Sequence, residues 1–129
     1  MFPRMVSDSP RDAAVAAEVL TRAVTRAAAR LGLTQRELAP ILGVSAASLS
    51  RVHNGQRLVD THGKEGELAL LFLRIYRSLD TLVGGDDAQA QCWLRAENTH
   101  LGGVPLTLLT RIQGVVDVAG YLDGMRGRV

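Results

Sequence analysis

The sequence predicts an all-α fold, and three stretches of it carry the prediction. Residues 34–54 read as two short capped helices joined by a glycine turn. Residues 10–31 hold the start signal, apolar repeat and stop signal of one longer helix. Residues 65–83 place apolar side chains at helical spacing over five turns of chain. We expect a helix-turn-helix region over residues 1–60 and a small helical region over residues 61–129.

The first helix is expected to begin at Pro10 and to end near Gly32. Ser9 is a serine cap before a proline in the first helical position, and Asp12 follows three residues after the cap. The apolar repeat that defines the helix comprises Val15, Val19, Val24, Ala27 and Leu31. Three arginines at four-residue spacing (Arg22, Arg26 and Arg30) form a row that either faces a DNA backbone or is a solvated stripe.

The helix-turn-helix is predicted from two N-caps on either side of a short turn. Thr34 can cap the first helix, and Glu37 can reach back to the Thr34 amide to close a capping box. Gly43 tolerates the positive φ of a tight turn, and Ser45 can cap the second helix. A helical hairpin that is buried in a core would not need an N-cap on each side of a short turn.

The second helix has the outward surface that a helix needs to enter the major groove of DNA. Its outer side chains are small, apart from the guanidinium of Arg51, which can reach phosphates or guanine. We expect Gln35 and Ser45 to contact phosphates, and Ser50 and Arg51 to reach base edges or nearby phosphates. The full set of predicted DNA-binding residues is Gln35, Arg36, Ser45, Ala46, Ala47, Ser50 and Arg51.

The segment resembles the Xre family of bacterial and phage repressors. The matching elements are T-Q-x-E-L-A at 34–39, L-G-V-S at 42–45 and S-x-S-R at 48–51. Pro40 departs from this pattern, because a proline inside a helix removes a backbone donor and crowds the preceding turn. We expect Pro40 to disturb the straightness of the first helix and the presentation of Gln35.

Charge divides the chain into a basic and a mildly acidic part. Residues 1–58 contain eight arginines and four acidic residues, a net charge of +4. Residues 59–129 contain seven basic and nine acidic residues, a net charge of −2. The basic part therefore holds the helix-turn-helix, as phosphate contact requires. Because +4 is a modest charge, we expect a homodimer that doubles the contact with DNA.

The long helix over residues 65–83 is apolar over more than one face. Its main face has Leu68, Leu71, Phe72, Ile75, Leu79 and Leu82, and further apolar residues widen it (Leu70, Leu73, Tyr76 and Val83). Such a helix must be covered on several sides. The cover is either a second subunit or the core of the same chain. Residues 59–64, which precede it, are a candidate hinge.

The C-terminal part is expected to hold three more helices. The Gly84-Gly85 pair ends the long helix, and Asp86 or Asp87 caps a helix that runs to Leu94. A polar loop over 95–103 leads to a short helix over 105–109. The last helix is predicted over 110–123, ending at Gly124. Its expected inward residues are Ile112, Val115, Val116, Ala119 and Leu122.

This C-terminal part is similar to the toxin-binding domain shared by Xre, MbcA and ParS antitoxins. The matching residues are Trp93-Leu94, Asn98, Leu101-Gly102-Gly103, Pro105-Leu106, Leu108-Leu109 and a valine-rich helix ending near Tyr121-Leu122. The resemblance implies a toxin-binding surface on the polar loop, the last helix and the tail. Its predicted residues are Asn98, Leu101, Gly102, Gly103, Tyr121, Arg126, Arg128 and Val129.

In the family that the chain resembles, the partner is usually a RES-domain toxin that consumes NAD or transfers ADP-ribose. The antitoxin blocks the toxin, and the complex represses its own operon. The alternative is a stand-alone regulator whose C-terminal region dimerises or senses a ligand. No catalytic or metal-ligand spacing is found, so we expect no enzyme, cofactor or metal. The lone Cys92 and the absence of a long apolar run favour a cytoplasmic protein without membrane contact.

Overall fold

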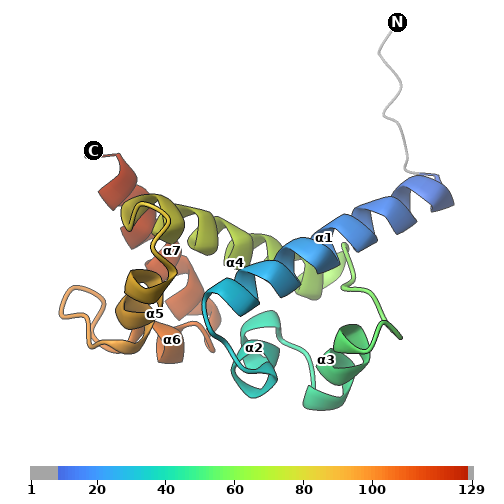
Figure 1. Cartoon of the computed structure of the whole chain (residues 1–129), viewed down its shortest axis with the longest axis horizontal. Coiled ribbons are helices and arrows are strands. Elements are labelled where there is room, and N and C mark those ends of the chain that lie inside the picture. The colour runs from blue at the N-terminus through green and yellow to red at the C-terminus, as the bar shows by residue number, and fades with distance from the viewer. Residues whose placement is uncertain (1–8, 128–129) are drawn as a thin grey trace, which may run out of the picture.

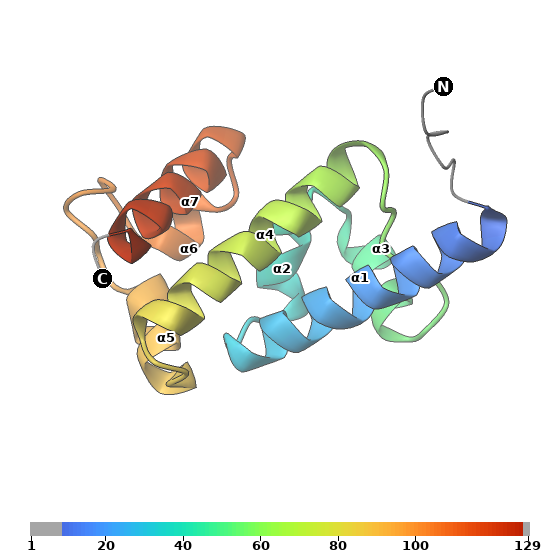
Figure 2. The same cartoon turned by 90° about the horizontal axis from the view of Figure 1, so that it is seen from above.

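The computed structural model describes residues 9–127, and these form seven α-helices (Figures 1 and 2). The helices are α1 (Pro10–Arg30), α2 (Gln35–Leu42), α3 (Ala46–His53), α4 (Gly63–Leu82), α5 (Asp87–Arg95), α6 (Pro105–Leu108) and α7 (Ile112–Arg126). The predicted all-α fold, with a helix-turn-helix ahead of a helical C-terminal region, is confirmed. Arg128 and Val129, two of the predicted toxin-binding residues, lie outside the described residues.

Helix α1 begins and ends where its sequence signals predicted. The Ser9 hydroxyl accepts a hydrogen bond from the Asp12 amide at 3.1 Å, and Gly32 adopts a positive φ after the last turn. The C-terminal half of α1 buries Val24, Ala27 and Ala28. Its N-terminal half extends beyond the rest of the molecule, which leaves Val19 59% exposed (Figures 1 and 2).

The two helices of the helix-turn-helix pack beneath α1 and α4 (Figure 1). Gly43 closes α2 in the left-handed conformation, with φ of 69°. Pro40 lies within α2, which nevertheless continues from Gln35 to Leu42. The expected disturbance is limited because the helix is fixed at both ends, by the capping box on one side and the Gly43 turn on the other.

Helix α4 is the centre of the fold. It contacts α1, α2, α5 and α7, and it completely buries Phe72, Ile75 and Leu79. The same chain therefore supplies most of the cover that its apolar faces require. The exception is Leu70, which is 59% exposed. The segment before α4 is tied down rather than loose, because the Val59 amide donates to the Thr21 hydroxyl at 2.8 Å.

The C-terminal helices wrap around the second half of α4. Helix α5 is capped by Asp86, and the short α6 opens with Pro105, both as predicted. Two inward residues predicted for α7 were wrong, since Ile112 is 58% and Val116 51% exposed. Helix α7 is rolled so that Gly114 lies directly on the backbone of α6. In this orientation Val118 is completely buried, whereas Ile112 and Val116 lie outside the buried face.

The predicted end of α7 at Gly124 was also wrong, because the helix continues to Arg126. Side-chain contacts with α4 hold this last turn in place. Arg74 pairs with Asp123, and the Arg126 guanidinium donates to the Ser78 hydroxyl at 3.2 Å. Gly124 can therefore remain helical, because the contacts of Asp123 and Arg126 with α4 hold the backbone on both sides of it. Between residues 9 and 127, no helix combines the length and apolarity needed to cross a lipid bilayer.

Candidate functional site

The outer surface of α3 is open along its length. Ala46, Ala47, Ser50 and Arg51 are all exposed, while Leu49 and Val52 face the core. The helix begins with small side chains, so a phosphate or a base edge can approach its N-terminal amides closely. The predicted outward row is therefore presented together on α3, the helix at the lower side of the molecule in Figure 1.

The Ser45 hydroxyl is already engaged in the cap of α3. It accepts from the Ser48 amide at 3.0 Å and donates to the Ser48 hydroxyl, also at 3.0 Å. The Arg51 guanidinium lies 3.5 Å from the same Ser48 hydroxyl. Because this last distance is at the limit for a hydrogen bond, Arg51 remains available to an external anion.

The N-terminus of α2 carries the other two predicted DNA-binding residues, Gln35 and Arg36, and both are exposed. The capping box that precedes them is complete. The Glu37 amide donates to the Thr34 hydroxyl at 3.1 Å, and the Thr34 amide donates to the Glu37 carboxylate at 2.9 Å. The side chain of Arg95 and the Thr34 amide lower the pKa of Glu37 to about 2. This carboxylate is therefore ionised at neutral pH.

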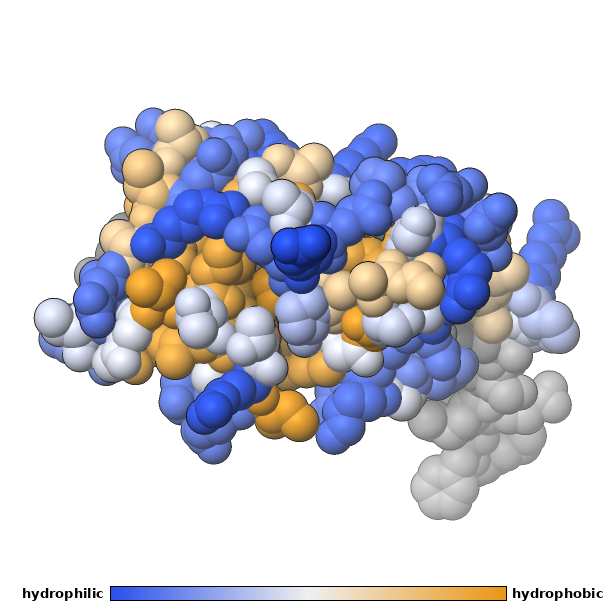
Figure 3. All heavy atoms as spheres, turned by 90° about the horizontal axis from the view of Figure 1, so that it is seen from below, coloured by the Kyte–Doolittle hydropathy of each residue, from blue (hydrophilic) through white to orange (hydrophobic). Residues whose placement is uncertain are grey.

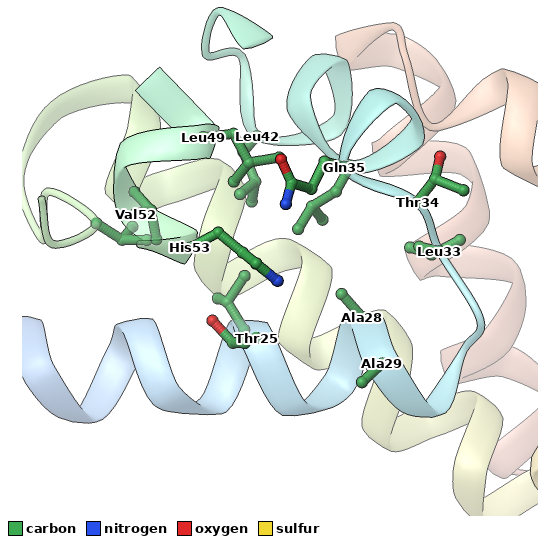
Figure 4. A pocket seen from close by; sticks show the side chains of 13 residues that line it. Thr25, Ala28, Ala29, Leu33, Thr34, Gln35, Leu42, Leu49, Val52 and His53 are labelled. Carbon is green, nitrogen blue, oxygen red and sulfur yellow. The ribbon is translucent and has the colours of Figure 1, made fainter. Parts of the chain in front are cut away.

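A small pocket of about 130 Å³ lies between α1, α2 and α3 (Figure 4). Its walls are mainly apolar and include Ala28, Leu42 and Leu49. Figure 4 shows the Gln35 amide directed over this pocket, toward the imidazole of His53. Gln35 must therefore turn away from the pocket to reach a phosphate, whereas the α3 residues already face outward.

The second predicted surface starts at the loop between α5 and α6, and Asn98 organises this loop. Asn98 pairs with Gly103 as an isolated antiparallel bridge, with the Asn98 amide donating to the Gly103 carbonyl at 2.9 Å. The Asn98 side-chain oxygen also accepts from the Leu101 amide at 3.1 Å. Gly102 permits the reversal with φ of 77°. These four predicted residues thus form one rigid turn.

Tyr121 of α7 joins the loop to the last helix. Its ring stacks with Trp93 at a centroid distance of 6.3 Å and with His100 at 5.9 Å. Beside it lies a hollow of about 450 Å³ lined by His100, Gly120, Tyr121, Gly124 and Met125. Neither Gly120 nor Gly124 has any atom close to where a Cβ would stand. The hollow can therefore admit another protein chain close to the α7 backbone.

Arg126 does not join the loop residues. Its guanidinium donates to Ser78 of α4, and Ser78 also donates to the Asp123 carboxylate at 3.3 Å. A separate apolar surface lies on the α5–α6 side of the molecule when it is viewed from below (Figure 3). Leu106 and Leu108 of α6 are half-buried there.

Sequence reasoning missed three residues that shape these surfaces. His100 and Gly120 line the hollow beside Tyr121, and Arg95 pairs with Glu37, which lies 58 positions earlier in the sequence. The spacing of Gly120 and Gly124, one helical turn apart, was the signal that could have indicated an open helix face. No local signal marks the partner of Arg95.

Comparison with known families finds two domains along the chain. Residues 10–74, half of the chain, match the antitoxin Xre-like helix-turn-helix domain. Residues 78–128 match the antitoxin Xre/MbcA/ParS C-terminal toxin-binding domain. No curated protein sequence matches the chain. The two matches follow one another along the chain and meet within α4. The chain therefore belongs to the antitoxins with an Xre-like helix-turn-helix domain, and it carries an Xre/MbcA/ParS toxin-binding domain at its C-terminus.

Proposed function

We propose that this antitoxin neutralises a RES-type toxin, which consumes NAD or transfers ADP-ribose, and that it represses its own operon. The observation that carries the proposal is the presence of two separate surfaces on one chain. The exposed side of α3 lies toward one end of the molecule, and the loop with the end of α7 lies toward the other (Figure 1). We propose that the protein acts in the cytoplasm and only through binding at these two surfaces, without catalysing a reaction.

The DNA-binding half of the proposal rests on α3 and on the N-terminus of α2. Ala46, Ala47, Ser50 and Arg51 enter the major groove, while Gln35, Arg36 and Ser45 contact the backbone. The exposed alanines allow the helix to approach closely, and Arg51 supplies the long donor.

Replacing Arg51 by alanine is expected to weaken operator binding by about 1–3 kcal/mol if its guanidinium reads a base. The reason is that a guanidinium forms charge-assisted hydrogen bonds that alanine cannot replace. A titration by gel shift, on the DNA fragment directly upstream of the coding sequence, measures the change. Unchanged affinity would show that Arg51 does not contact the operator.

The toxin-binding half of the proposal places the contact on the Asn98 turn, Tyr121 and the adjoining hollow. Leu101, Gly102 and Gly103 complete the turn, and Arg126 stands at the end of α7. We further propose that Arg128 and Val129 take part in this contact, since they follow directly after α7 in the sequence. A toxin that uses NAD would be blocked by any chain that occludes its cofactor cleft.

Co-expression with the product of the neighbouring reading frame tests this half. Cells that make only that product should stop growing and should either lose NAD or accumulate ADP-ribosylated protein, and the antitoxin should reverse these effects. Growth arrest with an unchanged NAD level and no ADP-ribosylated protein would retain the antitoxin role but reject the RES-type chemistry. Absence of any complex between the two products would favour a stand-alone regulator.

We also propose that the antitoxin is a homodimer. Support comes from the modest charge of the basic region and from the groove of about 440 Å³ between α1 and α4, lined by Val19, Ala23 and Leu70. Replacing Leu70 by glutamate should shift the protein toward monomer, because a carboxylate would enter an apolar contact. Sedimentation at micromolar concentration measures the effect. A wild-type monomer, both free and on DNA, would reject the dimer.

A further inference from the structure

Helix α5 meets the corner between α1 and α2 through three polar side chains on one of its faces. Asp87, Gln91 and Arg95 are spaced four residues apart, so they lie above one another along the helix. Asp87 pairs with Arg30 at 3.5 Å, and the Gln91 side-chain amide donates to the Arg30 carbonyl at 3.0 Å. The contacts of Asp87 and Gln91 hold the end of α1, whereas Arg95 reaches α2.

Arg95 makes the strongest of these contacts. Its two terminal nitrogens donate to the two carboxylate oxygens of Glu37, at 2.8 and 3.0 Å. One of them also donates to the Gly32 carbonyl at 3.1 Å. A two-pronged pair of this kind fixes direction as well as distance. Arg95 thus binds both the turn after α1 and the first turn of α2.

The same Glu37 carboxylate holds the N-terminus of α2. The oxygen that accepts from Arg95 at 3.0 Å also accepts from the Thr34 amide at 2.9 Å. The capping box and the ion pair therefore share one atom. Gln35 and Arg36, which the proposed function places against DNA phosphates, lie between the two capping residues.

Arg95 is also the last residue of α5, and Asn98 follows it within three residues. The Ala96 amide donates to the Cys92 carbonyl of α5 at 3.0 Å, so only Glu97 separates this end of the helix from Asn98. A displacement of the Asn98 turn therefore reaches Arg95 through a short stretch of chain. From Arg95 the displacement reaches the first turn of α2 through Glu37.

We infer that Arg95 is a positioning residue for DNA binding, through which the toxin-binding domain sets the N-terminus of α2. This inference rests on the proposed function, since it requires that α2 contacts the operator. Because coupling between two sites is reciprocal, toxin bound at the Asn98 turn and DNA bound at α2 each change the affinity of the other. The ion pair is the physical link between the two bound states.

The experiment compares three variants of the full-length chain with the wild type. Arg95→Met removes the ion pair, and Arg95→Lys retains one charged donor. Arg111→Met removes the same charge from an exposed position at the start of α7. Fluorescence anisotropy measures the affinity for the fluorescein-labelled upstream fragment. Urea titration measures the free energy of unfolding. NMR measures the hydrogen exchange of the Thr34 to Glu37 amides.

We expect Arg95→Met to weaken binding about tenfold relative to Arg111→Met, within the usual range for coupled sites. The exchange of the Thr34 amide should rise in the same variant, and Arg95→Lys should recover part of both losses. If Arg95 only stabilised the fold, Arg95→Met would lower the free energy of unfolding in urea without a local rise in the exchange of the Thr34 amide. Addition of the neighbouring gene product is expected to shift the operator affinity of the wild type and to leave that of Arg95→Met unchanged.

Equal affinities of Arg95→Met and Arg111→Met, with a wild type that binds the fragment, would overturn the inference and leave the proposed function intact. A wild type that fails to bind would instead overturn the proposed function. Unchanged amide exchange in Arg95→Met would overturn the positioning role in either case.

Discussion

Replacing Gly120 by arginine is expected to abolish toxin neutralisation while operator binding and folding are retained. The new side chain would fill the hollow between His100 and α7, where the partner chain is proposed to lie. No atom lies near the position of its Cβ, and arginine favours helix, so the antitoxin itself should not be strained. We expect toxin affinity to fall by about 100-fold, the scale of a lost contact at the centre of an interface.

The matched control is Gly120→Ala, which leaves the hollow almost unchanged in size. Growth of cells that co-express each variant with the neighbouring gene product provides the readout, together with the affinity of the purified pair. Gly120→Ala should protect the cells as wild type does. Full protection by Gly120→Arg would move the contact away from the hollow, to the exposed surface around α6 or to residues 128–129.

The helix-turn-helix could be predicted from sequence because its signals are local. Each cap joins residues three positions apart, as in the Thr34–Glu37 and Ser45–Ser48 contacts. The turn at Gly43 depends only on the freedom of one residue. These features form whenever the segment is helical, so no knowledge of the rest of the chain is needed to predict them.

The roll of α7 could not be predicted, because it depends on a contact that sequence periodicity does not reveal. Apolar spacing indicated that Ile112 and Val116 were candidates for the core, but it could not rank them against Val118. The choice between these faces is made by Gly114, whose lack of a side chain lets α7 touch α6. The Glu37–Arg95 pair was missed for a similar reason, since 58 residues separate the two partners.

The candidate toxin-binding surface was predicted in part. The Asn98 turn and Tyr121 matched a family pattern, and residues that define a family are often those that fold it. In the structure Asn98 and Gly102 indeed act within their own turn, through hydrogen bonds and a positive φ. The open surface beside them is formed by His100 and Gly120, which carry no such signature. The sequence therefore indicated the residues that fold this turn, whereas the open surface beside them is visible only in the structure.

Replacing Gly114 by alanine is expected to destabilise the protein by about 2–3 kcal/mol, the upper part of the range for overpacking. The new methyl group would overlap the backbone carbonyl of Leu108, which cannot move as a flexible side chain would. Alanine is the better helix former by about 1 kcal/mol, so the clash must exceed that gain. Urea unfolding measures the free energy difference, and Gly120→Ala on the same helix is the control.

Gly120→Ala should be as stable as wild type or more stable by about 0.5–1 kcal/mol, since it gains helix propensity without a clash. The two substitutions are chemically identical and six residues apart on α7, so helix propensity cancels between them. Their difference in unfolding free energy therefore reports the α6–α7 contact alone. If both variants were equally stable, the close approach at Gly114 would not exist in solution. The exposure of Ile112 and Val116 would then have to be explained by the packing of α7 on α4.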